Sequence, residues 1–234
     1  MTQLKLMSGG AAQGLVGGLR QRFEAESGVQ LDGQFGAVGV MRDRLLAGEA
    51  CDLMILSQAL IDDLTQAGHL VAGSARPLGV VKTGVALLPG AARAPIETPA
   101  QLRELLANAT AVYFPDPAKA TAGIHFMKVL DQLGVRESLA SRLCPYPNGA
   151  TAMREMAAQA REGAVGCTQV TEILYTPGVE LIGPLPPALG LSTVYSAAVC
   201  ARAAQPDAAR RLIQLLAGDE AAHLRLQGGF EAAV

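Results

Sequence analysis

The stretch that decides the fold is residues 111–130, which read AVYFPDPAKATAGIHFMKVL. An apolar strand over 111–114 ends at Asp116, which lies between two prolines, and an amphipathic helix begins near Thr121. The first backbone N–H groups of such a helix have no acceptor within the helix, and the helix dipole is positive at this end. This junction therefore predicts a binding position for an anion.

A second junction of the same kind lies near the start of the chain. Residues 4–7 form a strand, and Ser8-Gly9-Gly10 is expected to open the helix that follows, with Ser8 either contacting a ligand or serving as a simple N-cap. Because each half of the chain offers one such junction, the sequence predicts two lobes that close on one small, negatively charged ligand.

Strands and helices alternate along both halves of the chain. This alternation is typical of an α/β protein with mostly parallel sheets and right-handed crossovers. We expect one lobe at 1–80 plus 201–234 and the other at 85–190, with long strands at about 79–88 and 191–200 acting as hinges.

Four local features give sharper expectations. Ser57 is expected to cap the helix after the strand at 51–56, and Gly163 to end the helix at 151–162. Gly28 is expected to cap the end of the first helix, and the proline-rich segment 178–187 to be irregular.

Composition excludes several classes of protein. Half of the residues are hydrophobic and 17% are charged, so a sizeable core is expected rather than disorder. A formal net charge of −2 excludes a strongly basic nucleic-acid surface, and no apolar run is long enough for a membrane helix. Only 4% of residues are aromatic and none is tryptophan, which argues against stacking platforms for sugars or bases.

The four cysteines are widely spaced and form no C-x-x-C pair. Each lies in or beside an apolar strand, so buried free thiols are favoured over disulfides or metal ligands. No metal and no cofactor is expected. The cysteines are Cys51, Cys144, Cys167 and Cys200.

Several of these segments together resemble a known family, the molybdate-binding-protein-like group of the type II periplasmic solute-binding fold. The resemblance rests on residues 4–15, Phe35-Gly36, Asp116-Pro117 with Ala122-Gly123, and Pro184-Leu185-Pro186, and it covers nearly the whole chain. It implies a two-lobed clamp, with two mostly parallel sheets joined by two hinge strands.

Two positions depart from the molybdate-binding pattern. Where that group places paired hydroxyls and a late tyrosine, this chain has Ala37-Val38 and Gln169. A buried oxyanion needs its oxygens matched by donors, so these departures argue against molybdate or tungstate. Residues 121–126 and 168–173 are similar to another branch, which includes an aconitate isomerase.

Candidate ligand-binding residues cluster at the predicted junctions and strand ends, where open α/β sheets bind their ligands. Each has a structural alternative, such as helix capping, tight packing, a solvated surface charge or hydrogen bonding to buried backbone. The candidates are Ser8, Gly9, Gly10, Val38, Gly39, Lys82, Lys119, Thr121, Ala122, Asn148, Gln169 and Tyr195.

Two functions remain open; a third, the effector domain of a regulator, shares the fold but would need a DNA-reading module, which this sequence does not show. The first is a clamp that binds an oxyanion or a small di- or tricarboxylate without chemistry and, if exported, delivers it to a membrane (ABC) transporter. The second is an isomerase that moves a double bond in a small unsaturated polycarboxylate, with His125 or Glu172 as the catalytic base. The sequence as given favours a cytoplasmic protein, or a periplasmic one if a leader peptide was removed. Nucleic-acid and direct membrane partners are not expected.

Overall fold

The computed structural model describes residues 2–232. The chain divides into two compact units, unit 1 (1–81 and 193–234) and unit 2 (82–192). The chain passes from unit 1 to unit 2 within strand β4 (Arg76–Leu87) and returns at the start of strand β9 (Ser192–Val199).

Unit 1 contains a mostly parallel sheet whose strands run in the order β2-β1-β3-β9. The first three are parallel, and β9 is antiparallel to β3, with Leu53 opposite Val199 and Ser57 opposite Tyr195. The parallel strands are β1 (Gln3–Gly9), β2 (Gln30–Gly36) and β3 (Leu53–Ser57).

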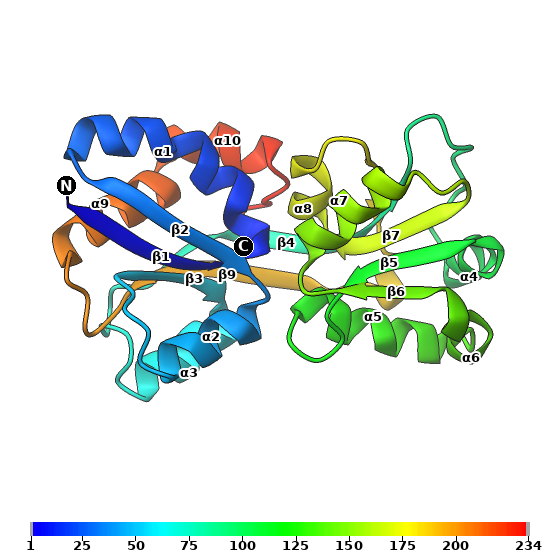
Figure 1. Ribbon diagram of the computed structural model, residues 1–234, viewed down its shortest axis with the longest axis horizontal. Helices are drawn as coiled ribbons and strands as arrows, with labels where there is room; N and C mark the ends of the chain where they lie inside the picture. Colours follow the sequence, from blue (N-terminus) through cyan, green and yellow to red (C-terminus); the bar gives the residue numbers. More distant parts are fainter. Residues whose placement is uncertain (1, 233–234) are drawn as a thin grey trace. The chain divides into compact units, whose positions relative to one another are not determined.

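Helices cover both faces of this sheet: α1, α9 and α10 lie on one side, and α2 and α3 on the other (Figure 1). A single core of aliphatic side chains with Phe23 and Phe230 joins these layers. The helical elements of unit 1 are η1 (Gly10–Ala12), α1 (Gln13–Ser27), α2 (Val38–Leu46), α3 (Gln58–Gln66), α9 (Pro206–Ala217), η4 (Asp219–Ala221) and α10 (Ala222–Gln227).

The strands of unit 2 run in the order β8-β4-β7-β5-β6. β5, β6 and β7 are parallel, whereas β4 is antiparallel to both β7 and β8. The strands not yet given are β5 (Ala111–Pro115), β6 (Leu143–Tyr146), β7 (Ala164–Gln169) and β8 (Glu180–Pro184).

Two apolar clusters sandwich the sheet of unit 2. One contains Phe114 and Phe126 and packs beneath α4 and α5, and the other contains Tyr113 and Met153 and packs beneath α7. In Figure 1, α5 and α6 lie on one side of the parallel strands, and α7 and α8 on the other. The helical elements are α4 (Pro99–Asn108), α5 (Thr121–Gln132), α6 (Arg136–Leu139), η2 (Ala140–Arg142), α7 (Gly149–Gln159), α8 (Val170–Tyr175) and η3 (Pro187–Leu189).

The structure confirms the expected α/β fold class, and Gly28 ends α1 in the left-handed conformation that favours glycine. Ser57 is the N-cap residue of α3, as expected, although its side chain makes no capping bond. Two local expectations were wrong. Ala160 rather than Gly163 ends α7 in the left-handed conformation. The segment expected to be irregular contains β8, because residues 180–184 pair with β4 despite their glycine and proline.

Candidate functional site

The α5 junction of unit 2 is fixed by the aspartate that precedes it. Asp116 Oδ1 accepts hydrogen bonds from the backbone N–H groups of Ala118 (2.7 Å) and Lys119 (2.9 Å), which holds the loop in a turn. A Cβ added to Gly123 would lie 2.2 Å from the Asp116 carbonyl oxygen, so glycine allows the first turn of α5 to pack directly on this loop.

The first turn of α5 has backbone donors that the helix does not use. The first i→i−4 hydrogen bond of the helix is donated by the Ile124 N–H to the Ala120 carbonyl (2.9 Å). The N–H groups of Thr121, Ala122 and Gly123 come before this bond and have no acceptor within the helix. No acidic side chain lies in this turn, and the half-buried Thr121 is its first residue rather than its cap. These groups can bind an anion.

The start of α7 contrasts with this arrangement, because an internal carboxylate occupies it. Glu172 is buried and hydrogen-bonds the backbone N–H groups of Gly149, Ala150 and Gln169, and its Oε2 accepts the Thr168 hydroxyl at 2.5 Å. Burial raises the pKa of Glu172, and these hydrogen bonds oppose the rise.

The predicted ligand residue Asn148 has a capping role in the same region. Its Oδ1 accepts the N–H of Thr151 at 2.8 Å, as an N-cap of α7. A Cβ on Gly149 would lie 2.0 Å from both Glu172 Oε2 and Thr168 Oγ1, so only glycine leaves room for the buried carboxylate.

In unit 1 the first junction differs from the predicted cap. Ser8 belongs to β1, is fully buried, and donates its hydroxyl to the Gly9 carbonyl at 2.8 Å; Gly9 itself is the N-cap of η1. The alternative role of Ser8 as a simple N-cap was therefore wrong, and its ligand contact stays a prediction. Sequence reasoning placed the helix start one residue too early because β1 extends through Gly9.

Three predicted residues of unit 1 converge. A Cβ on Gly9 would lie 2.7 Å from Val38 Cγ1 and 3.1 Å from Tyr195 Cε1, so β1, α2 and β9 meet there. The first i→i−4 hydrogen bond of α2 is donated by the Met41 N–H to the Ala37 carbonyl (3.1 Å), so the N–H groups of Val38 and Gly39 have no acceptor within the helix. No acidic side chain lies in this turn.

The candidate bases of the isomerase hypothesis both have structural partners. His125 Nε2 lies 2.8 Å from the Leu189 carbonyl oxygen, so this nitrogen carries the proton and ties α5 to η3. Glu172 holds the start of α7, as described above.

The other predicted residues are distributed over both units. Gly10 is buried in η1, and Ala122 is buried in α5. Lys82 is half-buried on β4, Lys119 is exposed before α5, and Gln169 is buried at the end of β7. Because β5, β6 and β7 are parallel, their carboxyl ends lie along one edge of the unit 2 sheet. Thr121 and Asn148 follow β5 and β6 at this edge, and Gln169 ends β7 there.

Sequence reasoning missed Thr168 and Gly149 as partners of Glu172. The signal was a threonine four residues before a glutamate at a strand-to-helix turn, with Asn148-Gly149 at the end of the neighbouring strand. Buried free thiols are observed at Cys51, Cys167 and Cys200, whereas Cys144 is half-buried.

Within residues 2–232 no group of three or more His, Cys, Asp or Glu side chains is arranged to hold a metal ion. Over the same residues no helix is both long enough and apolar enough to cross a membrane.

Comparison with known structures identifies the fold. The periplasmic molybdate-binding protein of Azotobacter vinelandii superposes with a TM-score of 0.80 at 18% identity, covering 99% of this chain and all of that one. The sulfate-binding protein SubI from Mycobacterium tuberculosis gives 0.74 at 19% identity, covering 100% and 88%. These similarities confirm the type II periplasmic binding fold.

A curated relative and a family model extend the comparison to sequence. An aconitate isomerase from a Pseudomonas species is 28% identical over 233 residues, which cover 95% of this chain and 85% of that protein. The family model described as bacterial extracellular solute-binding protein matches residues 4–231. Because that match spans nearly the whole sequence, the chain belongs to this family of solute-binding proteins.

Proposed function

We propose that the protein binds a small anion, an oxyanion or a di- or tricarboxylate, through backbone N–H groups at the starts of α2 and α5. The observation that carries the proposal is that the first turn of each helix has backbone N–H groups without an acceptor in the helix, and no acidic side chain. Such helix starts bind anions without a paired lysine or arginine.

The side chains around these donors favour carboxylates over tetrahedral oxyanions. Ala37 and Val38 add no hydroxyl at α2, so this helix start lacks the side-chain donors that would surround a buried tetrahedral oxyanion. A carboxylate presents two oxygens per group, which the N–H groups of one helix turn can match.

The family description also bears on compartment and partner. Members are described as extracellular, and the solved relative from Azotobacter vinelandii is periplasmic. We therefore include in the proposal that the protein is exported and delivers its ligand to a membrane transporter.

A thermal-shift screen tests the ligand class. The panel is molybdate, tungstate, sulfate, phosphate, citrate, and cis- and trans-aconitate, and only a ligand that binds the folded state raises the melting temperature. We expect a tricarboxylate to give the largest shift. A shift with molybdate and none with the carboxylates would overturn the assignment.

Two variants test the binding residues. Thr121→Val removes a hydroxyl beside the donors of α5, and Val38→Pro removes one N–H donor at the first position of α2, where a helix tolerates proline; each is expected to weaken the Kd about tenfold. Thr65→Val is the matched control, because Thr65 is also half-buried but donates to the Ile61 carbonyl within α3. If all three variants bind as the unmodified protein does, the proposed residues are wrong.

The aconitate isomerase relative favours a second candidate function, isomerisation of a small unsaturated polycarboxylate. His125 would be its base through Nδ1, since Nε2 is engaged by Leu189. Proton NMR of cis- and trans-aconitate incubated with the protein tests this directly. Tight binding with an unchanged spectrum excludes the isomerase.

A further inference from the structure

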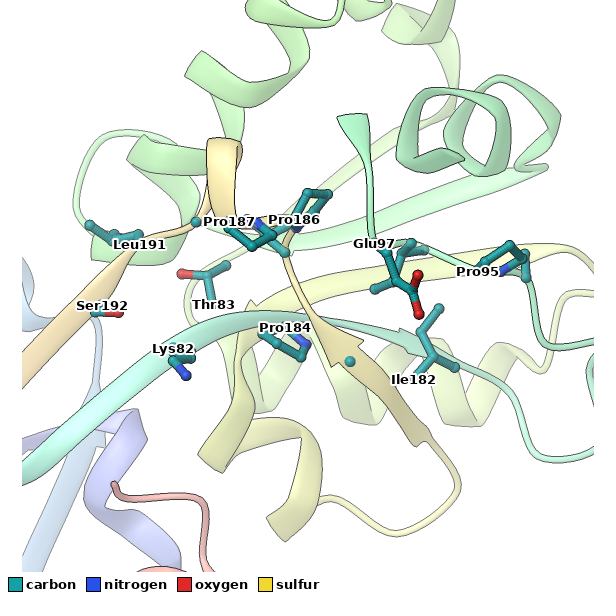
Figure 2. Close-up of a pocket in the computed structure, with 15 residues that line it drawn as sticks. Lys82, Thr83, Pro95, Glu97, Ile182, Pro184, Pro186, Pro187, Leu191 and Ser192 are labelled. Carbon is teal, nitrogen blue, oxygen red and sulfur yellow. The ribbon is translucent and has the colours of Figure 1, made fainter. Parts of the chain in front are cut away.

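Unit 2 contains a pocket that the anion proposal does not use. It has a volume of about 740 Å³, which lies within the usual range for small-molecule sites. β4, the segment before α4, β8 and the segment from η3 into β9 form its walls (Figure 2). Lys82 is the only residue among the anion-binding candidates that lines it.

The walls of this pocket are mostly aliphatic, and their polar side chains are those of Lys82, Thr83, Glu97 and Ser192. Ile96, Ile182, Leu185 and Leu191 line it, and no aromatic ring does. Four prolines also line it and have no backbone N–H: Pro95, Pro184, Pro186 and Pro187. The lack of aromatic rings disfavours sugars and nucleobases, and the aliphatic lining suits a branched aliphatic ligand.

One buried polar group in the wall lacks a partner. The Thr83 side chain is 1% exposed, and its hydroxyl makes no hydrogen bond among the described residues. Its backbone is fully engaged, because Thr83 N–H donates to the Leu191 carbonyl (3.0 Å) and its own carbonyl accepts from Leu185 (2.9 Å). In Figure 2 the Thr83 side chain rises from β4 toward Leu191 and Pro187. A buried hydroxyl of this kind is costly unless a ligand pairs with it.

A carboxylate lies at the other end of the pocket. Glu97 is exposed, and Figure 2 shows its side chain near Ile182, well away from Thr83. We propose that this pocket binds a branched aliphatic molecule that carries an ammonium group for Glu97 and an uncharged carbonyl oxygen for Thr83. The site is independent of the anion-binding proposal, because neither the start of α2 nor the start of α5 lines this pocket.

Three related probes separate the two polar contacts. L-Leucinamide carries both groups, N-acetyl-L-leucinamide lacks the ammonium charge, and 3-methylbutylamine lacks the carbonyl. Titration of the isotope-labelled full chain, followed by backbone amide NMR shifts, is expected to show saturable binding of leucinamide in the millimolar range, with shifts at the pocket residues. Each of the other two probes is expected to bind several-fold more weakly.

Two variants assign the contacts. Thr83→Val is expected to weaken leucinamide about fivefold and to leave 3-methylbutylamine unchanged, because that amine has no carbonyl for the hydroxyl. Glu97→Gln is expected to weaken leucinamide about threefold and to leave N-acetyl-L-leucinamide unchanged. Glu137→Gln, an exposed carboxylate on α6, is the matched control.

A stability measurement checks the premise. Since the Thr83 hydroxyl lacks a partner, Thr83→Val without ligand is expected to be at least as stable to heat as the unmodified protein. Three outcomes would each overturn the proposal. The first is equal affinity for the three probes, and the second is a marked loss of stability in Thr83→Val. The third is no saturable shift at the pocket residues up to 50 mM, which is about ten times the Kd expected for a ligand of this size.

Discussion

Helices α5 and α7 both begin after a strand but differ in their caps and in what their first N–H groups bind, because Asn148 caps α7 with its side chain and Ala120 of α5 cannot. Each follows a strand of the parallel part of the unit 2 sheet. At α7 the Glu172 carboxylate binds these groups from inside the protein, whereas the first turn of α5 has no acidic residue. The difference shows that internal side chains can bind the start of a helix, and under our proposal a ligand takes this place at α5.

Removal of the Glu172 carboxylate is expected to have the largest effect on stability. Glu172→Ala leaves the Thr168 hydroxyl and the N–H groups at α7 without an acceptor, so the free energy of unfolding should fall by about 3 kcal/mol. Urea denaturation measures this change, and added formate should restore part of the stability by binding in place of the side chain.

The exposed Glu137→Ala is the control for that substitution, and it should change stability by less than about 0.5 kcal/mol. A Glu172→Ala protein as stable as this control would mean that water satisfies the start of α7. The contrast with α5 would then disappear.

The close packing of α5 on its loop gives the next largest effect. In Gly123→Ala the new Cβ meets two backbone carbonyl oxygens, those of Pro115 (2.3 Å) and Asp116 (2.2 Å), and neither can move as a side chain does. We expect a loss of about 2 kcal/mol, from thermal or urea unfolding. Gly17→Ala, within α1 and with no heavy atom within 4 Å, should instead stabilise the protein by up to about 1 kcal/mol.

The sequence predicted where the helices of unit 2 begin better than it predicted which side chains bind their first N–H groups. The α5 junction could be read from Asp116 and Thr121, because strand, turn and helix signals there are local. The pairing of Glu172 with Gly149 could not, because it joins α7 and α8 through the tertiary fold. Residues 180–184 were missed as a strand for a related reason: pairing with β4 outweighs their low intrinsic preference.

At the first junction of unit 1, a glycine-to-alanine substitution is expected to cost less stability than Gly123→Ala does. In Gly9→Ala the added Cβ meets side-chain atoms of Val38 and Tyr195, which can shift, so the expected loss is about 1 kcal/mol. Comparison of its unfolding curve with that of Gly123→Ala measures how rigid the two junctions are. Equal losses would contradict the distinction between backbone and side-chain neighbours.

The smallest expected effect is a pH dependence that belongs to Glu172. Because burial raises its pKa in the folded state, the carboxyl group binds its proton more tightly when folded than when unfolded. Its contribution to stability is therefore fully present below the ordinary carboxyl pKa of 4.5 and is lost as the pH rises through the folded value. Glu172→Gln cannot titrate and should lack this component.

The measurement is the free energy of unfolding of both proteins from pH 4 upward. The advantage of the unmodified protein over Glu172→Gln should shrink as the pH rises. An advantage that grows with pH would mean that Thr168 and the helix N–H groups stabilise the charged form more than burial opposes it. In that case α7 would hold a full negative charge, and its start would be the internal counterpart of the anion complex proposed for α5.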